Sequence, residues 1–143
     1  MTDPYNLERF IDAQSETFDA ALAELLAGLK QGHWMWFVFP QLAGLGHSAA
    51  SKFYAIASLD EARAYLANPQ LGPRLRASVE ALLTWAGRNT AEQILGPIDA
   101  VKLRSSLTLF NQVSPDDLFG RALDAFFGGV EDERTLALLG MGR

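Results

Sequence analysis

Hydrophobic residues recur with helical spacing over most of the chain. Between residues 18 and 29, apolar side chains fall at i, i+3, i+4, i+7, i+8 and i+11, which places them in one stripe along a helix. Residues 71–86 carry a similar stripe, and Pro73 is tolerated there because it falls in the first turn. Shorter helical segments are predicted at residues 7–14, 49–56, 59–67, 98–112, 118–127 and 133–139. The spacing therefore predicts a succession of short helices.

Polar residues at the starts of these segments supply signals that begin a helix. A Ser, Thr, Asn or Asp side chain can accept a hydrogen bond from the unpaired N–H groups of the first turn. Candidate caps stand at Asn6, Ser15, Ser48, Ser58, Thr90, Ser114 (followed by Pro115) and Asp132. Ser58 and Thr90 have Glu61 and Gln93 three residues on, the spacing of a capping box. We therefore predict an all-α fold, a single domain over residues 1–143 with about seven to nine short helices.

One apolar segment, residues 34–39, has no readable period. Four of its six side chains are aromatic, and a run of this length fits either a strand or a helix. The helical surroundings and Pro40 favour a short buried helix. Phe37, Val38 and Phe39 have the character of core residues. The two indoles, Trp34 and Trp36, each need a partner for their N–H group, as at the wall of a pocket.

Polar residues of types that take part in binding or catalysis flank this aromatic segment. Lys30 and His33 precede it, and Gln41 and Gly44-Leu45-Gly46-His47-Ser48 follow it. Glycines before a helix let backbone N–H groups approach an anion, although an ordinary turn capped by Ser48 explains the same residues. The chain has 3 Lys against 9 Arg, and each lysine lies in or beside a Gly- or Ser-marked segment. The alternative to a site here is that Lys30 and His33 are ordinary surface residues.

A second unusual segment lies in the predicted helix over residues 98–112. Asp99, Lys102 and Ser106 stack at i, i+3 and i+7, with Ser105 beside them. Two consecutive serines are unfavourable inside a helix, because their hydroxyls compete for backbone groups. This face is either part of a site or a solvated surface with an Asp99–Lys102 ion pair. We expect Lys30, His33 and this face to meet, because one site would explain both departures from the helical pattern.

Composition and charge narrow the classes of function. The 143 residues are 49% hydrophobic and 20% charged, as in a globular domain. No cysteine is present, which excludes disulfides and thiolate metal sites, and two histidines do not predict a metal site. A net charge of −5 argues against nucleic acid or anionic lipid as partners. No membrane span or targeting segment is recognisable, so we expect a cytoplasmic protein without a cofactor or metal.

The unusual segments together resemble a known family. The matching motifs are Gly28-x-Lys30-x-x-His33-Trp34-Met35-Trp36-Phe37-Val38-Phe39-Pro40-Gln41, Gly44-Leu45-Gly46-x-Ser48 and Lys102-Leu103-x-Ser105-Ser106-x-Thr108-Leu109-Phe110. They are similar to a family of short bacterial and fungal proteins that carries a domain-of-unknown-function label and is sometimes marked "calpastatin". The resemblance covers nearly the whole chain and implies a compact all-helical domain, with no established activity, cofactor or catalytic residue. A disordered, polar protease inhibitor would not have this composition.

Two functions fit these observations. In the first, a pocket binds a small anionic ligand such as a nucleotide or phosphorylated metabolite. Its predicted ligand-binding residues are Lys30, Trp34, Trp36, Gln41, Ser48, Lys102, Ser105 and Ser106. If the pocket is catalytic, His33 is the candidate general acid or base, because its unperturbed pKa lies nearest neutrality. In the alternative, the protein is a non-enzymatic interaction module whose tryptophans contact a partner or a second copy. The sequence predicts neither the reaction nor the oligomeric state.

Overall fold

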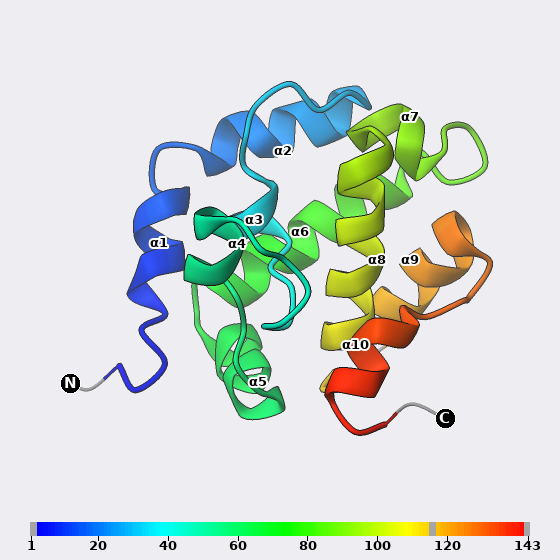
Figure 1. The fold of residues 1–143 in the computed structure, drawn as a ribbon. Helices are drawn as coiled ribbons and strands as arrows, with labels where there is room; N and C mark the ends of the chain where they lie inside the picture. The colour runs from blue at the N-terminus through cyan, green and yellow to red at the C-terminus, as the bar shows by residue number, and fades with distance from the viewer. Residues whose placement is uncertain (1–2, 115–116, 142–143) are drawn as a thin grey trace.

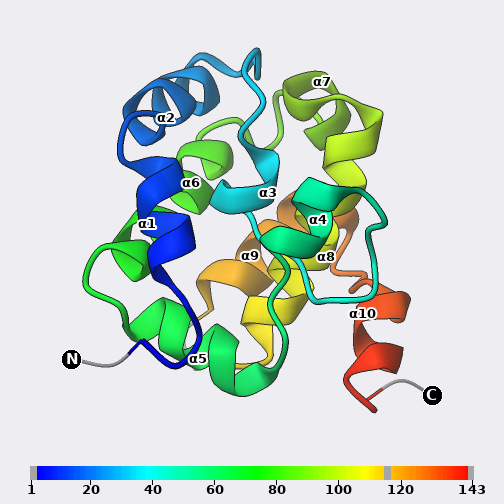
Figure 2. The same ribbon diagram turned by 60° about the vertical axis from the view of Figure 1, so that its left-hand side comes forward.

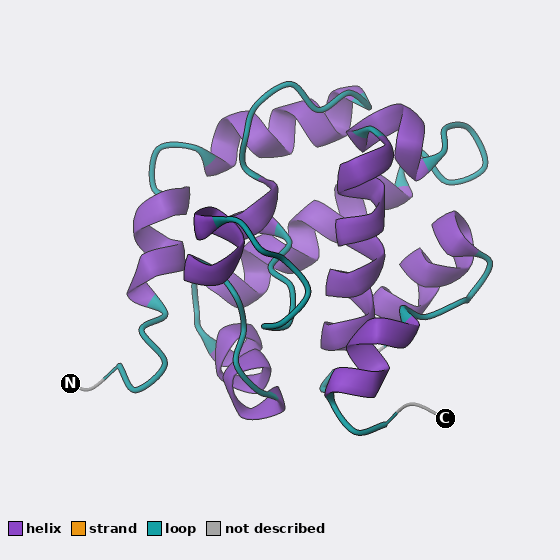
Figure 3. Cartoon of the chain, in the orientation of Figure 1, coloured by secondary structure: helices purple, strands orange, loops and turns teal. Residues whose placement is uncertain are grey.

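The computed structural model describes residues 3–114 and 117–141, and these residues form an all-helical fold (Figure 1, Figure 3). Its helices are α1 (Glu8–Gln14), α2 (Phe18–Ala27), α3 (Met35–Val38), α4 (Ala49–Phe53), α5 (Leu59–Ala67), α6 (Leu71–Leu83), α7 (Ala91–Leu95), α8 (Pro97–Asn111), α9 (Leu118–Phe127) and α10 (Glu133–Leu138). The described residues contain no strand, only an isolated parallel bridge between Leu42 and Ile56. The predicted all-α class is confirmed. The ten helices of the described residues exceed the predicted seven to nine, because some are single turns.

The core is organised around α8. This helix contacts α5, α7, α9 and α10, and every residue from 105 to 110 is buried. Six consecutive buried positions mean that protein surrounds this part of α8 on all sides. A chain of aromatic contacts links the core across four helices, from Phe10 to Tyr65 at 5.0 Å, Tyr65 to Phe110 at 5.4 Å and Phe110 to Phe119 at 5.9 Å between ring centroids. The two views in Figures 1 and 2 show α8 between α7 and α10.

The aromatic segment forms a short helix, as predicted. It begins after Trp34 and ends at Val38, because Phe39 leaves the helical region before Pro40. A buried glutamine, Gln14 on α1, donates a 2.6 Å hydrogen bond to the Phe37 carbonyl at the end of α3. The short helix is therefore held by tertiary contacts, since four residues are too few for an isolated helix.

Most of the predicted helix caps are confirmed. Ser48, Ser58, Thr90 and Asp132 each accept a hydrogen bond from the backbone N–H three residues on. Thr90 and Gln93 form the full capping box. In the other predicted box, Glu61 accepts the N–H of Ala57 rather than that of Ser58. The cap predicted at Ser114 is wrong, because its hydroxyl has no hydrogen-bond partner in the described part of the chain and Asp117 occupies the N-cap position of α9, without a side-chain cap. Pro115 lies outside the described residues.

The caps predicted at Asn6 and Ser15 are wrong. Asn6 adopts a left-handed conformation with φ of 52°, and the carboxylate of Asp3 accepts the N–H groups of Leu7 and Glu8 instead. These two hydrogen bonds lower the pKa of the Asp3 carboxyl. Ser15 ends α1, and its hydroxyl donates to the Asp12 carbonyl. α1 therefore begins at Glu8 and α2 at Phe18, later than caps at Asn6 and Ser15 would place them.

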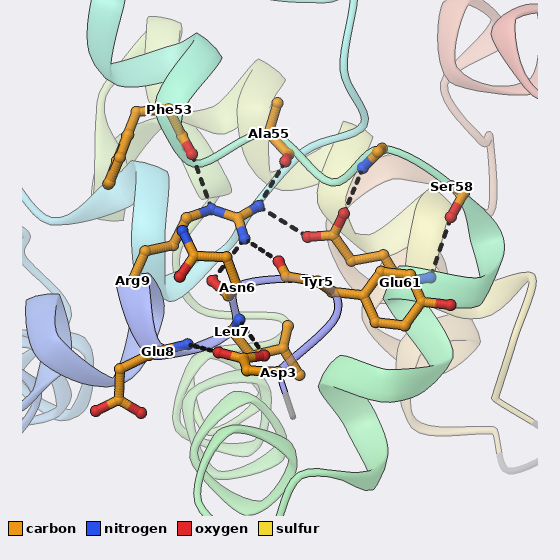
Figure 4. Close-up of polar contacts among 11 residues, drawn as sticks. Asp3, Tyr5, Asn6, Leu7, Glu8, Arg9, Phe53, Ala55, Ser58 and Glu61 are labelled. Atoms are coloured by element: carbon orange, nitrogen blue, oxygen red, sulfur yellow. Dashed lines mark hydrogen bonds and ion pairs between the residues drawn. The ribbon is translucent and has the colours of Figure 1, made fainter. Parts of the chain in front are cut away.

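The N-terminal segment is fixed to the rest of the fold by one arginine. Arg9 on α1 lies 2.8 Å from the carboxylate of Glu61 on α5, and the two side chains are only 9% and 4% exposed. The remaining guanidinium N–H groups donate to the backbone carbonyls of Tyr5, Asn6, Phe53 and Ala55 (Figure 4). All five donors of this side chain are thus used inside the protein. We name this the Arg9 cluster: Arg9, Glu61 and the four carbonyls.

Candidate functional site

Lys30 and Lys102, separated by about 70 residues in sequence, meet at one carboxylate. Asp99 in the first turn of α8 lies 2.9 Å from the Lys30 ammonium and 3.4 Å from that of Lys102. Lys30 follows α2, and its backbone N–H also donates to the Ile94 carbonyl of α7. The expected meeting of these two segments is therefore present. We call Lys30, Asp99 and Lys102 the lysine cluster.

The loop that carries Lys30 is held by Glu24 of α2. One carboxylate oxygen of Glu24 accepts hydrogen bonds from the N–H groups of Gln31 and Gly32 and from the indole N–H of Trp34. Partial burial opposes ionisation of this carboxyl, but the three hydrogen bonds and the nearby charge of Lys30 outweigh it, so the pKa of Glu24 is lowered. Glu24 thus fixes both the loop and the first tryptophan.

Within the lysine cluster, the two lysines differ in their availability. The Lys30 ammonium donates to the Gly32 carbonyl at 2.6 Å and pairs with Asp99, and its side chain is 10% exposed. The Lys102 side chain is 22% exposed, and its ammonium lies 4.8 Å from the centre of the Trp36 ring. The 3.4 Å ion pair with Asp99 is its only hydrogen bond or ion pair with the described residues. Lys102 is therefore the lysine that can bind a further group.

Two buried polar atoms near Lys102 have no hydrogen-bond partner among the described residues. They are the indole nitrogen of Trp36, whose ring lies beside the Lys102 ammonium, and the hydroxyl of Ser106, one turn along α8. Buried polar atoms are normally paired with protein or with ordered water. Their unpaired state distinguishes this side of α8 from the fully paired Arg9 cluster.

A cavity of about 410 Å³ lies beside Lys102, between α8, the loop before α4, and the start of α10. Its apolar walls come from Pro97, Ile98 and Val101 of α8 and from Leu45 of the loop. Figures 1 and 2 show this loop running past α8 toward α10. The cavity is thus open at the surface and joins three segments that are distant in sequence.

Two cations line this cavity from different helices. Lys102 comes from α8 and Arg134 from the first turn of α10, and the Arg134 side chain makes no ion pair with the described residues. Asp132 also lines the cavity, but its carboxylate is used by the N–H and hydroxyl of Thr135 and by the hydroxyl of Ser105. The cavity therefore offers cationic groups beside a carboxylate that is already hydrogen-bonded.

Comparison with known proteins identifies the family of the chain. Residues 4–139 match the family described as "Protein of unknown function (DUF1810)". This chain belongs to the DUF1810 family. The family resemblance expected from the motifs is thus confirmed, and the match covers both segments that build the lysine cluster. A search of the curated proteins found no match.

A solved structure shares the fold of this DUF1810 protein. It is the crystal structure of the conserved hypothetical protein Rv1873 from Mycobacterium tuberculosis, determined at 1.38 Å. The two chains are 46% identical, with a TM-score of 0.93, and the match covers 96% of this chain and 99% of that one. The all-helical architecture therefore extends to a relative whose structure was determined by experiment.

Three of the residues predicted for a site in this DUF1810 protein line the cavity, namely Gln41, Lys102 and Ser105. The others lie outside its lining: Lys30, His33, Trp34, Trp36, Ser48 and Ser106. Lys30 is neutralised in the lysine cluster, and Trp34 is a core residue at 1% exposure, so its ring cannot stack on a ligand. His33 is exposed, and Ser48 caps α4.

Several residues that line the cavity were not predicted to belong to a site, among them Arg134 and Ser51. Arg134 sits in a short amphipathic helix and looks in sequence like any surface arginine. Ser51 follows the Gly-x-Gly-x-Ser motif, and its N–H and hydroxyl both bond to Ser48. The sequence points to Arg134 only indirectly. The predicted cap Asp132 begins α10, and its contact with Ser105 places the first turn of α10 beside α8.

The described part of the chain shows neither a metal cluster nor a membrane span. No three His, Cys, Asp or Glu side chains among these residues are placed so that they could hold a metal ion. None of the helices described is long and apolar enough to cross a bilayer.

Proposed function

We propose that this DUF1810 protein binds a small anionic molecule in the 410 Å³ cavity between α8, α10 and the loop before α4. The observation that carries the proposal is that Lys102 and Arg134, from two separate helices, line one cavity whose other walls are largely apolar. Cavities of about 300–1,000 Å³ with apolar walls and a few convergent polar groups are typical of small-molecule sites. The ligand would place its anionic group on the cations and an apolar or ring-shaped body against Ile98 and Val101.

The charge of the chain favours a small ligand over a polymer. The net charge is −5, whereas two cations, Lys102 and Arg134, line the cavity. At physiological salt, charges more than about 8 Å apart are largely screened, so a small anion responds to the local cations. A nucleic acid would span a surface that repels it. A nucleotide or phosphorylated metabolite is therefore the ligand class that we propose.

The proposal concerns binding and assigns no reaction. His33, the candidate general acid or base, is exposed and does not line the cavity. Proton transfer requires the base within hydrogen-bond reach of the reacting group, directly or through one water.

A binding screen with matched variants tests this proposal. Nucleotides and sugar phosphates are screened by thermal shift at about 0.15 M salt, and hits are titrated by calorimetry. A ligand at a hundredfold excess over its Kd stabilises the fold by about 2.7 kcal/mol. Lys102→Gln and Arg134→Gln should each weaken binding roughly tenfold or more, since a hydrogen bond to a charged group contributes about 1.5–3 kcal/mol.

Arg121→Gln is the matched control, because Arg121 is an exposed arginine on α9 that pairs with Asp117 and is not among the residues that line the cavity. It should leave binding unchanged. Binding that survives both cavity variants, or that Arg121→Gln weakens equally, would contradict the proposal.

A second candidate function follows from exposed apolar residues at the same place. Ile98 and Val101 are 73% and 63% exposed, which fits a contact with another protein or a second copy of this chain. In that case light scattering would show a dimer or complex, and Val101→Asp would abolish it. A monomer that binds phosphate compounds would favour the ligand proposal.

A further inference from the structure

A second cavity adjoins the first. It has a volume of about 130 Å³ and lies under the loop before α4. Gln41, Gly46 and Ser51 line both cavities, so the two share one wall. Lys52, the residue after Ser51 on α4, lines only the smaller cavity. The third lysine of the chain therefore lines a cavity that adjoins the one lined by Arg134 and Lys102.

The smaller cavity is too small to be an independent site for a small molecule. Its 130 Å³ falls below the range of about 300–1,000 Å³ that is usual for such sites, whereas the larger cavity alone lies within it. Because the two cavities adjoin at Gln41, Gly46 and Ser51, one ligand can occupy both. A ligand that fills both must be elongated.

In the shared wall, Gly46 lets the loop pack closely against Ser51 of α4. A Cβ atom at Gly46 would lie 2.4 Å from the Cβ of Ser51, so any side chain at position 46 would force α4 away. Gln41 is fixed through its backbone, because its carbonyl accepts the Ile56 N–H at 2.8 Å. Its side-chain amide has no hydrogen bond with the described residues. That amide can donate to and accept from the middle of a ligand.

Both cavities are lined by cations that can bind an anion: Lys52 and Arg134 make no ion pair with the described residues, and Lys102 has the 3.4 Å pair with Asp99. Lys52 is exposed and lines the smaller cavity, whereas Lys102 and Arg134 line the larger one. Lysine provides a strongly hydrated point charge that suits a phosphate group, as does the planar fork of arginine.

We propose that the two cavities form one elongated site for a molecule with an anionic group at each end, such as a metabolite with two phosphate groups. Lys102 and Arg134 bind one group, the Gln41 amide contacts the middle, and Lys52 binds the other group. This inference rests on the proposed function and specifies its ligand class.

The test compares compounds that differ by one phosphate. The pairs are adenosine 5′-monophosphate with adenosine 3′,5′-bisphosphate, and fructose 6-phosphate with fructose 1,6-bisphosphate. Calorimetry with the full chain should give at least one pair in which the bisphosphate binds roughly tenfold more tightly. Lys52→Gln should remove that preference and leave the affinity for the monophosphate unchanged. Lys52→Arg should keep the preference, and Arg63→Gln, at an exposed residue on α5, should change nothing.

The outcomes separate the two proposals. Equal affinity for one- and two-phosphate forms, or a preference that survives Lys52→Gln, would overturn the elongated site and leave the proposed function standing. Failure of all four compounds to bind the wild-type protein would overturn both.

Discussion

The Arg9 cluster and the lysine cluster are both built from charged side chains with little exposure, yet they are completed in different ways. Arg9 uses five N–H donors on Glu61 and four backbone carbonyls. Lys102 has one carboxylate at 3.4 Å, an aromatic ring and an open cavity. The first cluster leaves nothing for a ligand to bind, whereas the second does.

The degree to which the fold itself pairs a charged side chain therefore distinguishes a structural role from a binding role, whatever the residue type. Burying a charge costs free energy unless hydrogen bonds and a counter-charge compensate for it. The Arg9 cluster is compensated within the fold, so its removal should damage stability. Lys102 is only partly compensated, and the Trp36 indole N–H and the Ser106 hydroxyl near it have no hydrogen-bond partner in the described part of the chain. A change there should damage binding more than stability.

The largest expected effect is on the Arg9 cluster. Arg9→Ala should lower the free energy of unfolding by about 3–5 kcal/mol, because it leaves the Glu61 carboxylate buried without its partner. Lys102→Ala should change it by less than about 1 kcal/mol. Urea denaturation followed by circular dichroism measures both. If Lys102→Ala destabilised the protein as much as Arg9→Ala, the contrast between the two clusters would be lost.

An intermediate effect is expected at Glu24, which holds the loop of the lysine cluster. The pKa of the Glu24 carboxyl is lowered in the folded protein from its ordinary value of 4.5. A lowered pKa gives stability that is present above about pH 4.5 and is lost as the pH falls through the folded value. Glu24→Gln should therefore cost about 1–2 kcal/mol at pH 7, since neutral hydrogen bonds replace charge-assisted ones.

The pH dependence provides the control for Glu24. Thermal melts between about pH 3 and pH 7 should show the two proteins converging as the pH falls, because wild-type Glu24 is then also uncharged. A constant difference across this range would show that the carboxylate charge contributes nothing to the loop.

The smallest expected effect on the free energy of unfolding is a difference between two neighbouring serines on α8. The Ser105 hydroxyl contacts the Asp132 carboxylate at 3.1 Å, whereas the buried Ser106 hydroxyl has no partner among the described residues. Ser105→Ala should cost about 1 kcal/mol, and Ser106→Ala should be neutral or slightly stabilising. Chemical denaturation resolves such differences. A cost at Ser106 equal to that at Ser105 would mean that Ser106 has a hydrogen-bond partner in solution.

Local sequence rules predicted much of this fold. The caps at Ser48, Ser58, Thr90 and Asp132 depend on residues three positions apart, so a sequence pattern contains all the information that they require. The cap predicted at Asn6 failed because Asp3 reaches the same N–H groups from outside the usual spacing.

The site was predicted in part. The pairing of the segments that carry Lys30 and Lys102 was expected because both depart from the helical pattern, and Asp99 joins them. The contribution of Arg134 was not expected, because its position beside α8 results from the tertiary contact between Ser105 and Asp132. Nor can the sequence distinguish a neutralised lysine such as Lys30 from an available one such as Lys102.

The central claim is that the cavity beside Lys102 and Arg134 is the binding site of this DUF1810 protein. Amide chemical shifts mapped by NMR during titration with the tightest-binding phosphate compound test it most directly. The account predicts perturbations confined to residues 41–52, 97–105 and 132–134, and their loss in Lys102→Gln. Perturbations centred on the Arg9 cluster, or unchanged by Lys102→Gln, would contradict it.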